Sequence, residues 1–121
     1  MTGRKRCILV VDDHPKLLKF IEIDLRLRAF EVFTARSGEE ALKLAKSAAP
    51  DIMLLDIVMP GIDGIEVLEK LKEFSTLPVI AFSASPENRE LALRAGASDF
   101  LQKPFDTEEM VARINALLPE G

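Results

Sequence analysis

Three aspartates, a serine and a lysine are the residues whose types could carry out chemistry together. They are Asp12, Asp13, Asp56, Ser83 and Lys103. Carboxylate oxygens select a hard cation, and two or three of them with water ligands suit Mg²⁺ better than a calcium cage. A metal ion, a lysine cation and a hydroxyl can neutralise the oxygens of a transferring phosphoryl group, while an aspartate acts as nucleophile and forms an acyl phosphate. These residue types therefore predict Mg²⁺-dependent phosphoryl chemistry, provided that the fold brings them together.

Short apolar segments precede each of these residues and predict the strands that position them. Uninterrupted apolar runs are typical of strands covered on both faces, and more polar runs suit the edges of a sheet. The acid pair follows the first predicted strand, Asp56 the third, Ser83 the fourth and Lys103 the fifth. The five predicted strands are residues 8–11, 31–35, 52–55, 79–82 and 98–102, of which the second and fifth are the polar ones.

Segments with helical periodicity lie between the strands. Capping-box spacing marks three helix starts, and Ser85-Pro86 places a proline at the first position of another helix, which we expect to end at Gly96. The only histidine, His14, is expected to be exposed in a first helical turn. The apolar stripes are Leu17/Leu18, Ile21 and Leu25; Leu42, Ala45 and Ala49; Ile65, Leu68 and Leu71; and Met110, Ile114 and Leu117. The capping pairs are Ser37 with Glu40, Asp63 with Glu66, and Asp106 with Glu109.

This alternation of strand and helix, five times over, predicts an α/β fold with a parallel sheet and helices on both faces. Central apolar strands with polar edges favour the order 2-1-3-4-5, a flavodoxin-like, doubly wound, three-layer (βα)₅ arrangement. In that order the functional crevice lies beyond the carboxyl ends of the first and third strands. We expect one domain over residues 1–121, with a basic N-terminal tail at 1–5 and a C-terminal tail at 119–121.

Composition excludes several classes of protein. The 121 residues carry 16 Lys and Arg against 20 Asp and Glu, a net charge of −4, which disfavours direct binding to nucleic acid or anionic membranes. One cysteine cannot form an intramolecular disulfide. The apolar run Cys7 to Val11 is too short for a signal peptide or a membrane span, so we expect no membrane insertion and a cytoplasmic location.

The motifs at the strand ends, taken in order, resemble the receiver domain of bacterial two-component response regulators over nearly the whole chain. They are Asp12-Asp13, the segment 54–64 that contains Asp56, Ser83-Ala84 and Lys103-Pro104-Phe105. The resemblance implies that Asp56 accepts a phosphoryl group from a sensor histidine kinase or a histidine phosphotransfer protein. It also implies that Asp13, Asp56 and the backbone carbonyl of Val58 ligate Mg²⁺, while Asp12 acts mainly through metal-bound water.

The resemblance further implies a coupled switch formed by Ser83 and Phe100. Phosphorylation would move the hydroxyl of Ser83 toward the phosphate and turn the ring of Phe100 inward behind it, which changes the face of the fourth helix, fifth strand and fifth helix. A downstream effector would bind through that face, and a homodimer is a further expectation. Phe100 stands where tyrosine is commoner. In this family the Lys103–Pro104 bond is usually cis. A receiver catalyses its own phosphorylation and dephosphorylation but turns over no independent substrate, so an enzyme in the usual sense is not expected.

Three other functions use similar chemistry or the same sheet. An aspartyl-phosphate phosphatase of the haloacid-dehalogenase type wants a second acid two residues after the nucleophile, where this chain has Val58. A flavin or nucleotide carrier would need a phosphate-binding loop after the first strand, but Asp12 and Asp13 stand there. A pseudo-receiver that only docks partners would not need all five pocket residues.

Overall fold

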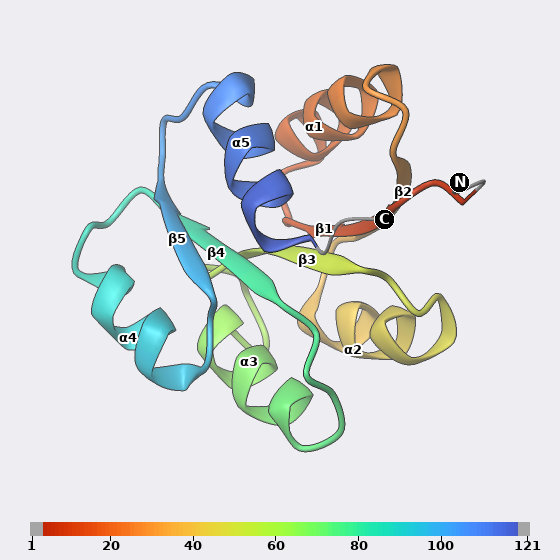
Figure 1. The fold of residues 1–121 in the computed structure, drawn as a ribbon. Coiled ribbons are helices and arrows are strands. Elements are labelled where there is room, and N and C mark those ends of the chain that lie inside the picture. Colours follow the sequence, from red (N-terminus) through yellow and green to blue (C-terminus); the bar gives the residue numbers. More distant parts are fainter. Residues whose placement is uncertain (1–3, 119–121) are drawn as a thin grey trace.

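A five-stranded parallel sheet forms the centre of the molecule, in a computed structural model that describes residues 4–118 (Figure 1). The strand order is β2-β1-β3-β4-β5, which confirms the predicted order and the flavodoxin-like α/β fold. The elements are β1 (Cys7–Val11), α1 (Pro15–Leu27), β2 (Glu31–Ala35), α2 (Gly38–Ser47), β3 (Ile52–Asp56), α3 (Gly64–Lys72), β4 (Val79–Ser83), α4 (Asn88–Ala95), β5 (Asp99–Gln102) and α5 (Thr107–Leu117).

Helices cover both faces of the sheet and enclose two separate apolar clusters. Helices α1 and α5 lie on one face, and α2, α3 and α4 lie on the other (Figure 1). Side chains alternate between the faces of a strand, so neighbouring residues enter different clusters. Ile8 and Val10 pack with α1 and α5, whereas Leu9 and Val11 pack with the opposite layer. The two clusters explain why β1, β3 and β4 are buried throughout and read as continuous apolar runs.

Three helices begin as the capping pairs predict. The side chains of Ser37, Asp63 and Asp106 each accept a hydrogen bond from the backbone N–H three residues later, at 3.2, 3.0 and 2.7 Å. Gly96 ends α4 with a φ of 118°, as predicted for a glycine in this position.

Two details of the helix predictions are wrong. Pro86 does not occupy the first position of α4, because the N–H groups of Asn88 and Arg89 bond to carbonyls only three residues back, and the regular helix starts at Asn88 after this tighter turn. Ala49 is not part of the α2 stripe. The helix ends at Ser47, and Ala49 turns the chain toward β3 with a φ of 48°.

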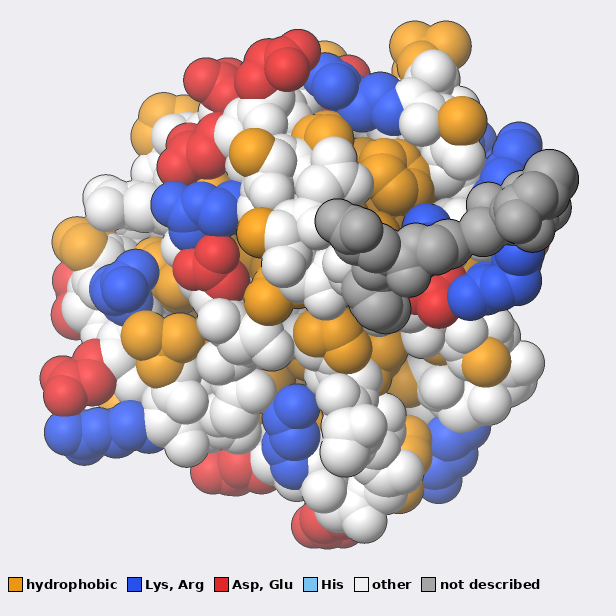
Figure 2. All heavy atoms as spheres, in the orientation of Figure 1, with side chains coloured by type: hydrophobic (Ala, Val, Ile, Leu, Met, Phe, Trp, Pro, Cys, Tyr) orange, Lys and Arg blue, Asp and Glu red, His pale blue; other side chains and the backbone are white. Residues whose placement is uncertain are grey.

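The predicted tails are residues 1–5 and 119–121. Residues 1–3 and 119–121 lie outside the described residues. Arg4, expected in the basic tail, forms an ion pair with Asp51 at 2.7 Å. None of the helices between residues 4 and 118 has the length and apolarity required to cross a membrane. Acidic and basic side chains are interspersed on the face shown in Figure 2.

Candidate functional site

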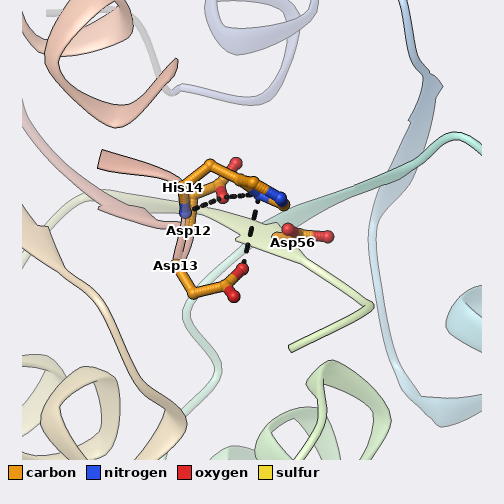
Figure 3. Close-up of side chains that lie close together, drawn as sticks. All are labelled: Asp12, Asp13, His14 and Asp56. Atoms are coloured by element: carbon orange, nitrogen blue, oxygen red, sulfur yellow. Dashed lines mark hydrogen bonds and ion pairs between the residues drawn. The ribbon is translucent and has the colours of Figure 1, made fainter. Parts of the chain in front are cut away.

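The strand register places the acidic residues side by side at the carboxyl edge of the sheet. Val11 pairs with Leu55 between β1 and β3, so the next residues, Asp12 and Asp56, lie side by side at this edge. Both occupy positions of the alternation that face α1 and α5. Figure 3 shows Asp12, Asp13, His14 and Asp56 gathered at this edge, and one ligand atom from each lies within 4.8 Å of the others.

Asp12 and Asp56 are almost fully buried, with 0% and 2% of their surface exposed. The Oδ1 atom of Asp12 accepts a hydrogen bond from the backbone N–H of His14 at 2.8 Å, and that of Asp56 from Val58 at 3.0 Å. The Oδ2 atoms of both residues have no hydrogen-bond partner among residues 4–118. Buried carboxylate oxygens without a partner are costly, so this pair requires a cation.

Lys103 supplies one positive charge to the pair. Its Nζ lies 3.5 Å from Asp12 Oδ2 and 3.6 Å from Asp56 Oδ2, at ion-pair distance from both. Burial is the main reason that the pKa of Asp56 rises to about 6, and the negative charges of Asp12 and Asp13 add to it. The Val58 N–H bond and the Lys103 charge oppose the rise without cancelling it. One lysine is therefore not enough to neutralise the three carboxylates.

The arrangement fits a hard divalent cation. The buried oxygens without a hydrogen-bond partner among the described residues, Asp12 Oδ2, Asp13 Oδ1 and Asp56 Oδ2, form an oxygen-rich donor set on one side of the crevice. Val58, the predicted source of a carbonyl ligand, follows Asp56 in the loop before α3 and is 60% exposed. A cavity of about 240 Å³ adjoins Asp56, and its lining includes Val58, Ser83 and Lys103. The structure thus brings the predicted site residues of four strands to one place.

Of the two predicted switch residues, Ser83 is the last residue of β4 and Phe100 lies within β5. Ser83 is buried, and its Oγ accepts hydrogen bonds from Asn88 Nδ2 at 2.9 Å and from Ser85 N at 3.1 Å. Phe100 is also buried and belongs to the cluster under α2, α3 and α4. The N–H of Lys103 bonds to the carbonyl of Ser83 at 2.8 Å, and the Lys103–Pro104 bond is cis, as expected.

Two residues of the site region were not assigned a role from the sequence. His14 is exposed as expected, with 66% of its side chain accessible, but its Nδ1 also lies 3.0 Å from Asp12 Oδ1 and 3.4 Å from Asp13 Oδ1. An aspartate often accepts a hydrogen bond from the backbone N–H two residues later, and this local pattern could have identified the contact of Asp12 with His14. Asn88 reaches Ser83 across a turn of five residues, for which no local pattern exists.

Comparisons with known proteins agree with this geometry. Residues 8–115 match the family model described as the response regulator receiver domain. The chain is 40% identical over 111 residues to the transcriptional regulatory protein KdpE of Mycobacterium tuberculosis, covering 90% of this chain and 49% of KdpE. It is 46% identical over 114 residues to PrrA of Mycobacterium leprae, with 92% and 49% covered. The chain therefore spans about half the length of the curated relatives it matches.

Solved structures show the same fold. The response regulator TrrA of Thermotoga maritima, solved in complex with Mg²⁺-BeF, superimposes with a TM-score of 0.86 at 36% identity, covering 93% of this chain and 99% of TrrA. The receiver domain of the Francisella response regulator 1452 gives a TM-score of 0.87 at 36% identity, with 93% and 96% covered. The matched family model, the relatives and the acidic crevice at the carboxyl edge of the sheet agree, and the chain belongs to the response regulator receiver domain family.

Proposed function

We propose that this chain is a phosphorylation-dependent signalling switch in which Asp56 carries the phosphoryl group. The observation that supports this proposal most directly is the Oδ2 atom of Asp56. It is buried, it lacks a hydrogen-bond partner within the described residues, and Asp56 lines a 240 Å³ cavity together with Lys103. Membership of the receiver family supports a role in two-component signalling, and the crevice supports Asp56 as the acceptor.

In the proposed reaction, Asp56 Oδ2 attacks the phosphorus of the donor. A bond forms between Oδ2 and phosphorus while the bond from phosphorus to the donor's leaving atom breaks, and the donor keeps that electron pair. Lys103, already at ion-pair distance from Asp56 Oδ2, balances charge on the phosphoryl oxygens. The hydroxyl of Ser83 lines the same cavity and can donate a hydrogen bond to one of these oxygens.

Mg²⁺ is the proposed cofactor. Asp13, Asp56 and the carbonyl of Val58 would ligate it, with Asp12 acting through water. When bound, Mg²⁺ supplies positive charge that the phosphoryl oxygens and the acid cluster need. The Mg²⁺-BeF complex of TrrA supports this assignment by similarity.

The proposed partners follow from the family. A sensor histidine kinase or a histidine phosphotransfer protein would supply the phosphoryl group. A downstream effector, or a second copy of the chain in a homodimer, would bind the face formed by α4, β5 and α5. We propose that the chain processes only its own phosphoryl group, and that it acts in the cytoplasm, since its relatives KdpE and PrrA are transcriptional regulatory proteins.

Acetyl phosphate with Mg²⁺ tests the proposal. Wild-type protein should gain the mass of one phosphoryl group, whereas Asp56→Asn and wild type in excess chelator should not. Asp63→Asn is the matched control in the same loop, because asparagine caps a helix as well as aspartate does. Labelling of Asp56→Asn would refute the assignment of the acceptor. Steady hydrolysis of unrelated phosphate esters would favour a phosphatase, and absence of labelling in wild type would favour a pseudo-receiver.

A further inference from the structure

The side chain of Ser83 is held on the side of α4. Its Oγ accepts two hydrogen bonds, from Asn88 Nδ2 at 2.9 Å and from Ser85 N at 3.1 Å, so both of its lone pairs are in use. Ser83 is 1% exposed. Among the hydrogen bonds of residues 4–118, none joins the hydroxyl to Asp56 or to the ammonium of Lys103, although all three residues line the same cavity.

Asn88 is the first residue of α4, and this helix is weakly anchored at that end. The preceding residue, Glu87, has helical dihedrals and gives no side-chain cap. The first backbone bonds, from Asn88 N to Ser85 O and from Arg89 N to Pro86 O, are both 3.1 Å long and belong to a three-residue turn. Ala92 is the one residue of α4 that is fully buried. The bond from Asn88 to Ser83 therefore ties the start of a loosely packed helix to the end of a central strand.

We propose that Asn88 is a positioning residue that holds the Ser83 hydroxyl in the unphosphorylated state and releases it when a phosphoryl group occupies the cavity. This inference rests on the proposed function. Alternation along the strands places the side chain of Ser83 toward the layer of α4 and that of Asp56 toward the layer of α1 and α5. Donation to a phosphoryl oxygen on Asp56 would therefore turn the hydroxyl about its Cα–Cβ bond to another staggered position, about 120° away. That turn carries Oγ away from Asn88, which leaves the first turn of α4 without its tie to β4.

Binding of a phosphoryl group or its mimic at Asp56 and release of the start of α4 are thermodynamically linked, because both depend on the hydroxyl of Ser83. A ligand that needs the released hydroxyl must overcome the bond to Asn88, so removal of that bond should tighten binding of the ligand. One neutral hydrogen bond corresponds to a change of about two- to tenfold in such an equilibrium. The same linkage predicts that the ligand loosens α4, since binding and release of the helix start share this contact.

Beryllofluoride with Mg²⁺ is the probe, titrated into the full chain by calorimetry. Asn88→Ala should bind it about two- to tenfold more tightly than wild type. Asn88→Asp should not bind it more tightly, because the carboxylate can accept the hydroxyl proton of Ser83 and keep the two residues bonded. Glu87→Ala is the matched control at the adjacent position and should bind like wild type. In a Ser83→Ala background, Asn88→Ala should have no effect.

Amide hydrogen exchange gives a second, independent measurement. In wild type, beryllofluoride should speed exchange in the first turn of α4. In Asn88→Ala the exchange there should be fast before the probe is added. If Asn88 only stabilised the helix, its replacement by alanine would speed exchange but would not tighten binding of the probe.

Equal or weaker binding by Asn88→Ala, or tighter binding that persists in the Ser83→Ala background, would overturn the inference while leaving the proposed function intact. Failure of the wild-type chain to bind beryllofluoride would overturn the proposed function, and the inference with it.

Discussion

Replacement of Asp56 by asparagine should stabilise the protein at neutral pH in the absence of divalent cations. The reason is the raised pKa of this carboxyl group, about 6 in the folded protein against 3.8 for the free side chain. Each unit of difference corresponds to about 1.4 kcal/mol, so ionised Asp56 lowers the free energy of unfolding by about 3 kcal/mol. Asparagine removes that charge and keeps an oxygen to accept the Val58 N–H.

The charge of Lys103 already lowers this pKa, so its effect is included in the value of about 3 kcal/mol. The amide N–H group of asparagine would be buried at the same position and would need a new hydrogen-bond partner, which offsets about 1–2 kcal/mol of the gain. We expect a net gain of about 1–2 kcal/mol for Asp56→Asn at pH 7.5. For a domain of this size, that corresponds to a rise in Tm of about 4–8 °C.

The pH dependence of this gain in stability tests whether the ionised carboxylate of Asp56 is its cause. Because the folded state holds the Asp56 proton more tightly than the unfolded state, the contribution of Asp56 is fully favourable below about pH 4 and is lost as the pH rises through about 6. The advantage of Asp56→Asn should therefore be present at pH 7.5 and should disappear at pH 4.

Scanning calorimetry in chelator, at both pH values, measures the effect, with Asp63→Asn as the control that should not change Tm. A lower Tm for Asp56→Asn at pH 7.5, or an equal gain in Tm at pH 4, would show that ionisation of Asp56 does not destabilise the folded protein as inferred. Addition of Mg²⁺ should stabilise wild type more than Asp56→Asn, because the variant has lost a proposed ligand.

Two further substitutions test how the site and the α4–β5–α5 face are held. Gly64→Ala should lower the free energy of unfolding by about 1–3 kcal/mol and slow labelling by acetyl phosphate, since a Cβ there would lie 2.5 Å from the Cα of Ile57. Arg113→Ala should cost about 1–2 kcal/mol in urea unfolding, because the guanidinium bonds to Asp99 at 2.9 Å and to the nearby backbone. Arg94→Ala, which removes only an exposed pair within α4, should cost less than about 0.5 kcal/mol. Equal losses in the free energy of unfolding for Arg113→Ala and Arg94→Ala would contradict the role assigned to Arg113.

The position of the acids could be predicted from the sequence because it depends on rules that apply to every parallel sheet. Apolar runs identify buried strands, and the carboxyl ends of parallel strands share one edge, so Asp12, Asp56 and Lys103 had to meet there. The register of β1 with β3 then places the first two side by side.

The loop between β4 and α4 could not be predicted in the same way. Pro86 favours a helix start, but a tighter turn precedes Asn88, so the helix begins two residues later. In this loop Ser85 N and Asn88 Nδ2 donate hydrogen bonds to Ser83 Oγ. The contact between Asn88 and Ser83 spans that turn, so it follows from the three-dimensional path of the chain and from no local periodicity. Ala49 differs from prediction for a related reason, because the chain must turn early to reach β3.

The two apolar clusters lie on opposite faces of the sheet, and this arrangement bears on how a change at Asp56 could affect α4. Asp12 and Asp56 face the layer of α1 and α5, whereas α4 packs on the opposite side of the sheet. In the proposed switch, the hydrogen bond between Asn88 and Ser83 at the edge of the sheet would link Asp56 to α4 without any rearrangement of the two apolar clusters.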